Sequence, residues 1–336
     1  MKVCVVGAGA MGGLVGVKLA LAGEDVTVVD IGAQLEAIRK NGLKLIGPDG
    51  KEEVARPRQA VSSVSEAGKQ DLVVLALKTQ HIASVDKALD TMFGAETVLV
   101  PVQNGLPWWY FQRHGGPYEG RRLETCDPTG EISAAIDPAR IIGCVVYPAG
   151  EVVAPGVVKH VEGDRFPLGE LDGKETDRVK RVSEVFIKAG LKAPVLNNIR
   201  SEIWLKLWGN MSFNPISALT HATLVDICQY PLTRELAAQM MTEAQVIANK
   251  LGIEFRVPLE KRIAGAEKVG KHKTSTLQDV EHGRSLELDT IIGSVIELGK
   301  LVGVPTPHID TVFALTKLLD KTLTEERGKL MIQRVA

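Results

Sequence analysis

Residues 2–22 read KVCVVGAGAMGGLVGVKLALA, a β-branched run followed by a glycine-rich turn and a helical pattern. The run Lys2–Val6 predicts a strand, and Gly13–Ala22 predicts a helix that ends at Gly23. Between them, Gly7–Gly12 has the spacing Gly-x-Gly-x-x-Gly. A glycine turn that joins a strand directly to a helix is typical of the first unit of an open α/β sheet that binds a nucleotide.

Each glycine of this turn has a separate physical use. Gly7 permits a tight turn, Gly9 lets a pyrophosphate approach the backbone, and Gly12 lets the helix pack closely against the strand. The helix N-terminus then faces the phosphate charge. The alternative is a glycine-rich turn that binds no nucleotide. We expect the cofactor contacts to come from Gly7, Ala8, Gly9, Ala10, Met11 and Gly12.

An acidic residue, Asp30, closes the second predicted strand, Asp25–Val29. Its carboxylate is suited to hydrogen-bond an adenosine ribose diol, and it would repel a 2′-phosphate. The sequence therefore favours NAD(H) over NADP(H), unless Arg39 or Lys40 folds back toward a phosphate.

The first half of the chain continues as alternating strands and helices, which predicts a parallel sheet covered by helices. Further strands are expected at Asp71–Leu77, which is apolar enough for an inner strand, and at Thr97–Val102. The runs Ile141–Tyr147 and Val157–Val161 resemble an antiparallel meander, and we expect them to extend this sheet. The helix Lys174–Ala189 and a short strand near 193–196 complete this region.

From Arg200 onward only helical periodicity remains. We expect an α/β Rossmann domain over residues 1–197 and an all-α domain over residues 198–336. The predicted helices of the second domain are Ile203–Leu219, Pro231–Leu251, Val257–Val269, Ser285–Leu301 and His308–Leu319.

The composition excludes several classes of protein. With 40 basic and 41 acidic residues, the chain has a net charge of −1, which does not suggest a nucleic-acid partner or an anionic membrane. The 4 cysteines lie far apart and the 7 histidines have no ligand spacing, so neither disulfides nor a metal site is predicted. Without a signal peptide or a membrane span, a cytoplasmic protein is expected.

A polar stripe lies in the apolar segment Trp204–Pro215. Lys206, Asn210 and Asn214 are spaced four residues apart, so they share one face of the predicted helix. The stripe is either a solvated face with a snorkelling lysine or a catalytic lysine accompanied by amides that bind substrate.

Two more polar residues follow predicted strands, where ligands of open parallel sheets bind. Lys78 follows Asp71–Leu77 and could contact a cofactor phosphate or simply lie on the surface. Asn104 follows Thr97–Val102 and precedes Gly105. It could bind the nicotinamide ribose or the active-site lysine, or it could only suit a left-handed turn.

In order and spacing over nearly the whole chain, these motifs resemble the ketopantoate reductase (2-dehydropantoate 2-reductase) family. The residues that carry the resemblance are the glycine loop, Lys78, Asn104-Gly105, Lys206-x-x-x-Asn210-x-x-x-Asn214-Pro215, and Ser275–Asp279 with Glu287. The resemblance implies a Rossmann domain followed by a helical domain like that of 6-phosphogluconate dehydrogenase. It also implies hydride transfer from a reduced nicotinamide to a small 2-oxo acid, and a homodimer.

The resemblance further implies a role for each polar residue. Lys206 would be the general acid that protonates the carbonyl oxygen, with Asn104 orienting it. Asn210 and Asn214 would bind substrate oxygens. Ser275 would hold the substrate carboxylate or only begin a helix, and Glu287 would accept a bond from a substrate hydroxyl, pair with Lys206, or face solvent.

The chain departs from the family pattern in four places. Members that use NADP resemble one another in a basic residue after the second strand, where this chain has Asp30-Ile31-Gly32, which again favours NADH. Leu224 stands where some members place an asparagine against the substrate, so a related 2-oxo acid is an alternative substrate. His81 stands where the family often has a glutamine three residues after the lysine. The segment Leu106–Ile136 is long, and its Trp108 and Trp109 either pack the loop or select a bulkier, more apolar 2-oxo acid.

Two other functions are compatible with a dinucleotide-binding first domain. An opine-type dehydrogenase would join an amino acid to a 2-oxo acid, but such enzymes would rely on a histidine base rather than on Lys206. A non-catalytic dinucleotide sensor would have no need of Lys206, Asn210 and Glu287. We therefore expect an NAD(P)H-dependent 2-oxo acid reductase, most simply one that converts ketopantoate to pantoate.

Overall fold

The computed structural model describes residues 1–333 of the chain, which form two compact units. The first unit comprises Met1–Gln103, Trp108–Arg122 and Asp127–Ile199. The second contains Arg200 onward together with two short segments from earlier in the chain, Asn104–Pro107 and Leu123–Cys126. The chain therefore contributes two pieces of its first half to the helical unit.

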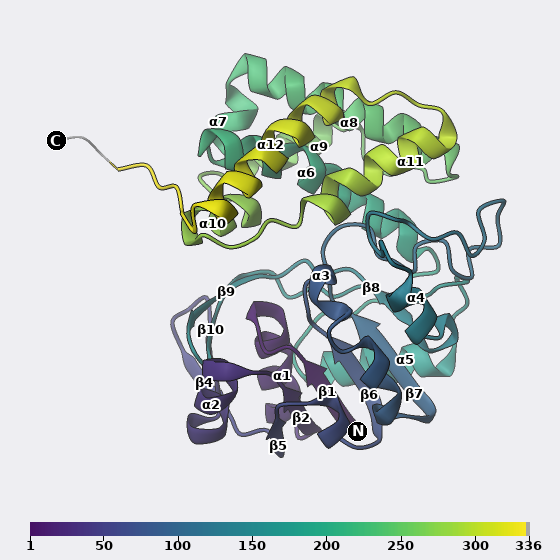
Figure 1. Cartoon of the computed structure of the whole chain (residues 1–336), viewed down its shortest axis with the longest axis vertical. Helices are drawn as coiled ribbons and strands as arrows, with labels where there is room; N and C mark the ends of the chain where they lie inside the picture. The colour runs from purple at the N-terminus through teal and green to yellow at the C-terminus, as the bar shows by residue number, and fades with distance from the viewer. Residues whose placement is uncertain (334–336) are drawn as a thin grey trace. The chain divides into compact units, whose positions relative to one another are not determined.

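A five-stranded parallel sheet forms the centre of the first unit, with strand order β5-β2-β1-β6-β7 (Figure 1). This is the doubly wound order expected of a Rossmann domain, and it confirms the predicted fold class. The topological switch point lies between β1 and β6. The strands are β1 Lys2–Val6, β2 Asp25–Val29, β5 Gln59–Val61, β6 Gln70–Leu75 and β7 Phe93–Pro101.

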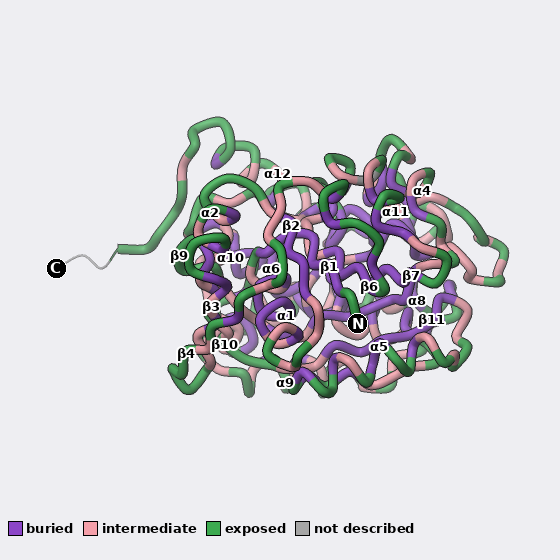
Figure 2. Tube along the Cα trace, turned by 90° about the horizontal axis from the view of Figure 1, so that it is seen from below, coloured by how far each residue is buried: buried purple, intermediate pink, exposed green. Residues whose placement is uncertain are grey.

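The apolar runs form this sheet because helices or further strands cover both of its faces. In β1 the residues from Val3 to Val6 are all at most 1% exposed, and Leu72–Leu75 of β6 are fully buried (Figure 2). Strands β1 and β6 are in parallel register from Val3 opposite Leu72 to Val6 opposite Leu75. The carboxyl ends of these two strands therefore lie side by side.

The later strands do not extend this sheet as the sequence suggested. A separate sheet has the order β4-β3-β10-β9, and a third contains only β11 and β8. In the described part of the chain, an isolated parallel bridge between Leu99 and Ile141 joins β7 to the residue just before β8. The prediction was wrong because β3 and β4 were not recognised in the sequence. Strand β10 pairs with β3 on one side and with β9 on the other, and β4 pairs with β3. These strands are β3 Leu43–Ile46, β4 Glu52–Ala55, β8 Ile142–Cys144, β9 Ala149–Ala154, β10 Val157–Glu162 and β11 Leu168–Glu170.

Two helices of the first unit, α1 Ala10–Leu21 and α5 Asp177–Lys188, form where the sequence predicted them, with shifted ends, and the other helices had no predicted bounds. These others are α2 Gly32–Asn41, α3 Thr79–Ile82 and α4 Glu131–Ala135, with short 3₁₀ turns at Val64–Glu66, Asp86–Met92 and Pro138–Arg140. Gly190 has φ +79° just after α5, as expected for the residue that ends a helix. The predicted strand near 193–196 does not form, because only single bridges involve Lys192 and Val195.

All the regular secondary structure in the described residues of the second unit is helical, as predicted. Its elements are α6 Ile199–Thr220, which begins at the last residue of the first unit, α7 Leu224–Gln229, α8 Pro231–Lys250, α9 Leu259–Lys268, α10 Ser275–His282, the π-helical turn η4 Asp289–Gly293, α11 Ser294–Val302 and α12 Pro307–Glu325. One helix had been expected over Ser285–Leu301, but the regular helix is replaced by η4 at its start. No helix among residues 1–333 is long and apolar enough to cross a membrane.

The aromatic segment after Asn104-Gly105 packs inside the first unit. Trp108 and Trp109 are each 1% exposed, and Tyr110 and Phe111 are fully buried. A Cβ added to Gly143 would lie only 2.8 Å from the Trp109 ring, so β8 and this ring are in close contact. These side chains support the packing interpretation, because burial at this level leaves no surface for a substrate to contact.

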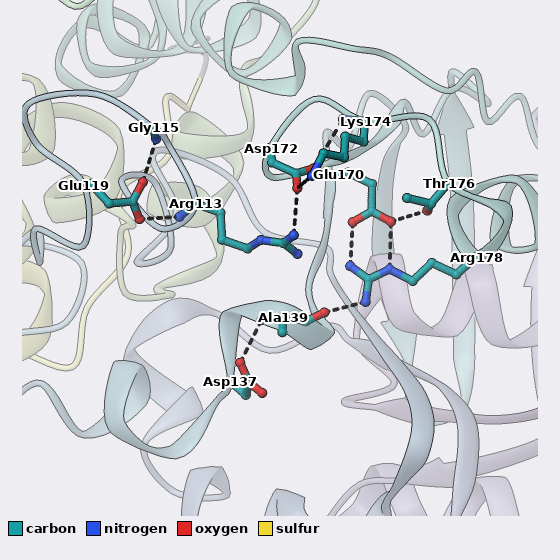
Figure 3. A network of polar contacts seen from close by, with 10 residues as sticks. All are labelled: Arg113, Gly115, Glu119, Asp137, Ala139, Glu170, Asp172, Lys174, Thr176 and Arg178. Atoms are coloured by element: carbon teal, nitrogen blue, oxygen red, sulfur yellow. Dashed lines mark hydrogen bonds and ion pairs between the residues drawn. The ribbon is translucent and has the colours of Figure 1, made fainter.

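A network of charged groups holds the loop that follows (Figure 3). Arg113 donates to Asp172 at 2.7 Å, while Glu119 accepts from the backbone N–H groups of Arg113 and Gly115. Burial tends to raise the pKa of Asp172, but hydrogen bonds from Lys174 and the charge of Arg113 hold that pKa below its usual value. The loop is thus attached to the residues that follow β11.

Candidate functional site

The glycine loop has the geometry that a dinucleotide pyrophosphate requires. A Cβ on Gly12 would lie 1.8 Å from the Gly7 carbonyl oxygen, so no other residue permits this approach of α1 to the loop. Gly9 is exposed, and a Cβ there would meet nothing within 4 Å, which leaves its surface open to a ligand. Helix α1 has no side-chain cap, so its first N–H groups are available to a phosphate.

Asp30 lies beside this loop. Its carboxylate accepts a hydrogen bond from the Ala8 N–H at 2.6 Å and another from the Ile31 N–H at 2.7 Å. Each oxygen of a carboxylate can accept about two hydrogen bonds. One acceptor position per oxygen therefore remains for the two hydroxyls of a ribose, so the residues present fit a bound dinucleotide.

Gln34 is a residue of this site that sequence reasoning missed. Its amide donates to the Ala8 carbonyl at 2.6 Å and accepts from the Gly156 N–H at 2.9 Å. Asp30 thus binds the backbone N–H of Ala8, and Gln34 binds its backbone C=O. No sequence motif indicated Gln34, because its partners lie 26 and 122 residues away.

Lys78 is placed near the loop in a different way from that expected. Strand β6 ends at Leu75, and Lys78 immediately precedes α3 rather than following the strand directly. A Cβ on Gly7 would lie 2.7 Å from Leu77 and 3.0 Å from the Ala76 carbonyl, so the segment before Lys78 touches the glycine loop. The lysine is half-buried at the carboxyl end of the sheet.

The polar stripe of α6 contacts Asn104, which lies three residues after the end of β7. The Lys206 ammonium donates a hydrogen bond of 2.5 Å to Asn104 Oδ1, and both residues belong to the second unit. Among the described residues, Asn104 is not one of those with positive φ; Gly105 takes that conformation, with φ +81°. The left-handed-turn explanation for Asn104 is therefore wrong.

Two of the predicted substrate residues are also in contact. Asn214, which is 6% exposed, donates to the Ser275 hydroxyl at 3.4 Å. Thr274 caps α10, so Ser275 is the first residue of this helix. Ser275 is exposed. Asn210 and Glu287 are half-buried. The second unit thus contains the whole predicted set of Asn104, Lys206, Asn210, Asn214, Ser275 and Glu287.

The arrangement is suited to acid catalysis on an oxygen atom. An ammonium group carries three N–H bonds, so the bond to Asn104 fixes the directions of the other two. Amide and hydroxyl groups in the same unit can hold the oxygens of a carboxylate or carbonyl. Among residues 1–333, no group of three or more His, Cys, Asp and Glu side chains is arranged to hold a metal ion.

Comparison with known proteins matches both parts of the chain to one family. The model for ketopantoate reductase PanE/ApbA matches residues 3–108, and the model for its C-terminal domain matches residues 198–320. A 2-dehydropantoate 2-reductase of Mesorhizobium japonicum is 52% identical over 98% of this chain and 99% of the relative.

Solved structures agree with these matches. A protein of Ralstonia solanacearum MolK2 has a TM-score of 0.91 and 39% identity, over 96% of this chain and 98% of its own. A 2-dehydropantoate 2-reductase of Methylococcus capsulatus has a TM-score of 0.80 and 27% identity, again over 96% of this chain and 98% of its own.

A glycine loop that fits a pyrophosphate and a lysine directed by an amide define a class of enzyme. The chain is an oxidoreductase that uses a nicotinamide dinucleotide. Within that class, it belongs to the ketopantoate reductase family. The resemblance drawn from the sequence is thereby confirmed.

Proposed function

We propose that this chain reduces 2-dehydropantoate, or a closely related 2-oxo acid, to the 2-hydroxy acid with Lys206 as the general acid. The observation that carries the proposal is the 2.5 Å hydrogen bond from Lys206 to Asn104. The same unit holds a second polar pair, Asn214 with the hydroxyl of Ser275. The name of the Mesorhizobium relative, 2-dehydropantoate 2-reductase, supports the same substrate. This match favours the reductase over an opine-type enzyme or a sensor.

In this mechanism each residue has one task. A reduced nicotinamide, when bound, supplies a hydride to the carbonyl carbon, and the electron pair of the C=O bond moves to oxygen. Lys206 gives that oxygen a proton and stabilises its developing negative charge until the proton is transferred. Asn104 directs the ammonium group, Asn210 and Asn214 bind substrate oxygens, and Ser275 holds the carboxylate. Glu287 accepts a bond from a substrate hydroxyl.

The loop residues and two charged side chains would hold the cofactor. Gly7–Gly12 provides backbone N–H groups for the pyrophosphate, and Lys78 provides a positive charge near the same loop. Asp30 binds the adenosine ribose. The homodimer, the cytoplasmic location and the absence of nucleic-acid or membrane partners remain predictions.

The substrate proposal is tested by following dinucleotide oxidation with 2-dehydropantoate and a panel of 2-oxo acids that differ in bulk. We expect the highest kcat/KM for 2-dehydropantoate or for a branched 2-oxo acid of similar size. The same assay with an added amino acid separates a reductase from an opine-type enzyme, because only the latter requires an amine. Failure to oxidise the dinucleotide with every acid in the panel would contradict the proposal.

We further propose a preference for NADH. Asp30 would face the 2′-phosphate of NADPH with a negative charge, and exposed Ile31 stands where NADP-using members resemble one another in a basic residue. Arg39 donates from its Nε to the Ala60 carbonyl at 2.9 Å. This arginine is therefore engaged at β5 instead of being directed toward Asp30.

The cofactor preference predicts a change on substitution of Asp30. Wild-type enzyme should have a higher kcat/KM with NADH than with NADPH, and Asp30→Ala should lower that ratio by about tenfold. Two charges about 4 Å apart near a surface interact by roughly 1–4 kcal/mol, and 1.4 kcal/mol is a factor of about ten. Glu36→Ala, an exposed carboxylate on α2, is the matched control and should leave the ratio unchanged. A strong preference of wild type for NADPH would refute this use of Asp30.

A further inference from the structure

The segment Asn104–Pro107 is bound directly to the π-helical turn η4. The Leu106 N–H donates to the Thr290 carbonyl at 2.8 Å. One residue earlier, a Cβ on Gly105 would lie 2.4 Å from the same carbonyl oxygen and 2.6 Å from its carbon. The backbone of Gly105 is therefore in close contact with the backbone of Thr290.

Only glycine permits this contact. Gly105 has φ +81°, a conformation that other residues rarely adopt. The two nearest atoms that a Cβ would meet are the backbone oxygen and carbon of Thr290, and the third is the Thr290 Oγ1 at 2.8 Å. Rotation of the Thr290 side chain would therefore not make room for it. Any larger residue must move either the segment or the turn.

A second attachment supports the first. The Cys126 thiol donates to the Leu106 carbonyl at 3.2 Å. The neighbouring residues Glu124 and Thr125 donate backbone N–H bonds of 2.8 and 2.9 Å to the Glu297 carboxylate, which also accepts from the Thr125 hydroxyl at 2.6 Å. The two segments taken from the first half of the chain are thus tied to each other and to the η4–α11 region.

The same turn also binds the backbone of Glu287, two residues before its start. The Thr290 hydroxyl donates to the Glu287 carbonyl at 3.4 Å, and the Ile291 N–H donates to it at 3.3 Å. Single π-helical turns inside helices frequently occur at functional sites. Here one such turn holds the backbone next to Asn104 and the backbone of Glu287.

We propose that the contact between Gly105 and Thr290 holds Asn104 in the position that catalysis requires. Gly105 and Thr290 are then positioning residues, which act on the reaction through Asn104. The contact sets the place of Asn104 Oδ1, and through it the direction of the Lys206 ammonium. This inference rests on the proposed function, since it explains how the Lys206 ammonium is directed toward the substrate oxygen. A displacement of about 1 Å in such a group can cost roughly 100-fold in rate.

The test compares two glycines of nearly equal φ in the second unit. Gly105→Ala should lower kcat by roughly 100-fold, while the KM for the 2-oxo acid and the Kd for NADH change by less than about threefold. Gly252→Ala is the matched control, because Gly252 has φ +80° but a Cβ there would meet nothing within 4 Å. It carries the same backbone strain and should leave kcat unchanged.

A double-mutant cycle distinguishes positioning from a general structural role. In an Asn104→Ala background, adding Gly105→Ala should change kcat by less than about threefold, because the residue through which it acts is already gone. Equal losses in both backgrounds, or a wild-type kcat for Gly105→Ala, would overturn the inference. Loss of activity in Lys206→Met with no effect of Gly105→Ala would overturn this inference alone, whereas an unaffected Lys206→Met would reject the proposed function.

A milder pair of variants decides the matter if Gly105→Ala does not fold. Cys126→Ala removes the donor to the Leu106 carbonyl, whereas Cys126→Ser keeps one. We expect kcat to fall several-fold in the alanine variant and to recover in the serine variant, with Kd for NADH the same in both. An equal kcat in the two variants would contradict the proposed positioning.

Discussion

Replacement of Lys206 by methionine is expected to lower kcat for 2-oxo acid reduction by roughly 10²–10⁴-fold, the usual contribution of a general acid. Methionine keeps the length and most of the packing of the lysine stem but has no proton to donate. Since Lys206 bonds to Asn104 within the second unit, the Kd for NADH should stay near the wild-type value. Steady-state kinetics together with fluorescence titration of NADH would measure both quantities.

The control for this substitution is another lysine of the second unit. Lys250 is exposed and donates to the Val302 carbonyl at 3.0 Å, so Lys250→Met removes a charge and a hydrogen bond away from the proposed site. Its kcat should match wild type. If Lys206→Met retained wild-type kcat, the lysine would be only a snorkelling residue of a solvated stripe.

The second large effect is expected in the glycine loop. Gly12→Ala places a Cβ 1.8 Å from the Gly7 carbonyl oxygen and 2.9 Å from the Ala76 side chain. Overpacking of this kind costs about 1–3 kcal/mol of stability. The loop must open to relieve it, so we expect the Kd for NADH to rise by roughly 100-fold, about 2.7 kcal/mol of binding free energy. Thermal unfolding and NADH titration would test the two parts.

Two neighbouring glycines separate loop geometry from ligand contact. Gly16→Ala in α1 would make only an ordinary contact, 3.8 Å from Val5, and should leave both stability and NADH binding intact. Gly9→Ala meets no protein atom within 4 Å, so its melting temperature should be unchanged. Its Kd should nevertheless rise about tenfold or more, because the methyl group would occupy space that the pyrophosphate needs. Unchanged NADH affinity in Gly9→Ala would show that the pyrophosphate does not lie on this loop.

Local sequence signals predicted the elements that depend on short-range periodicity. Strands β1 and β2 have the predicted bounds, Lys2–Val6 and Asp25–Val29. The ends of a β-branched run are well defined in the sequence when a glycine turn lies at one end and a polar residue at the other. Helix α8 differs from its prediction by one residue. The prediction failed for β3 and β4, because their short runs contain charged residues and lack the strong apolar pattern used to find strands.

In the candidate site too, features set by residues close in sequence were predicted, whereas contacts between residues far apart in sequence were not. The four-residue spacing of Lys206, Asn210 and Asn214 was sufficient to place them on one helix face. Spacing could not reveal that Gln34 holds the Ala8 carbonyl or that Gly105 rests on Thr290, since these contacts join residues with no motif in common. Nor could it show that the tryptophans after Gly105 are buried, because aromatic residues suit both a core and a binding surface.

The sequence by itself determined the class of fold, the glycine loop and the polar stripe of α6. Each of these is set by backbone conformation and side-chain period within a few turns or strands. Only the tertiary structure decided that Asn104 leaves the first unit, joins the second and accepts the Lys206 hydrogen bond. That choice depends on backbone contacts between residues 185 positions apart, Gly105 and Thr290, and such contacts leave no periodic trace in the chain.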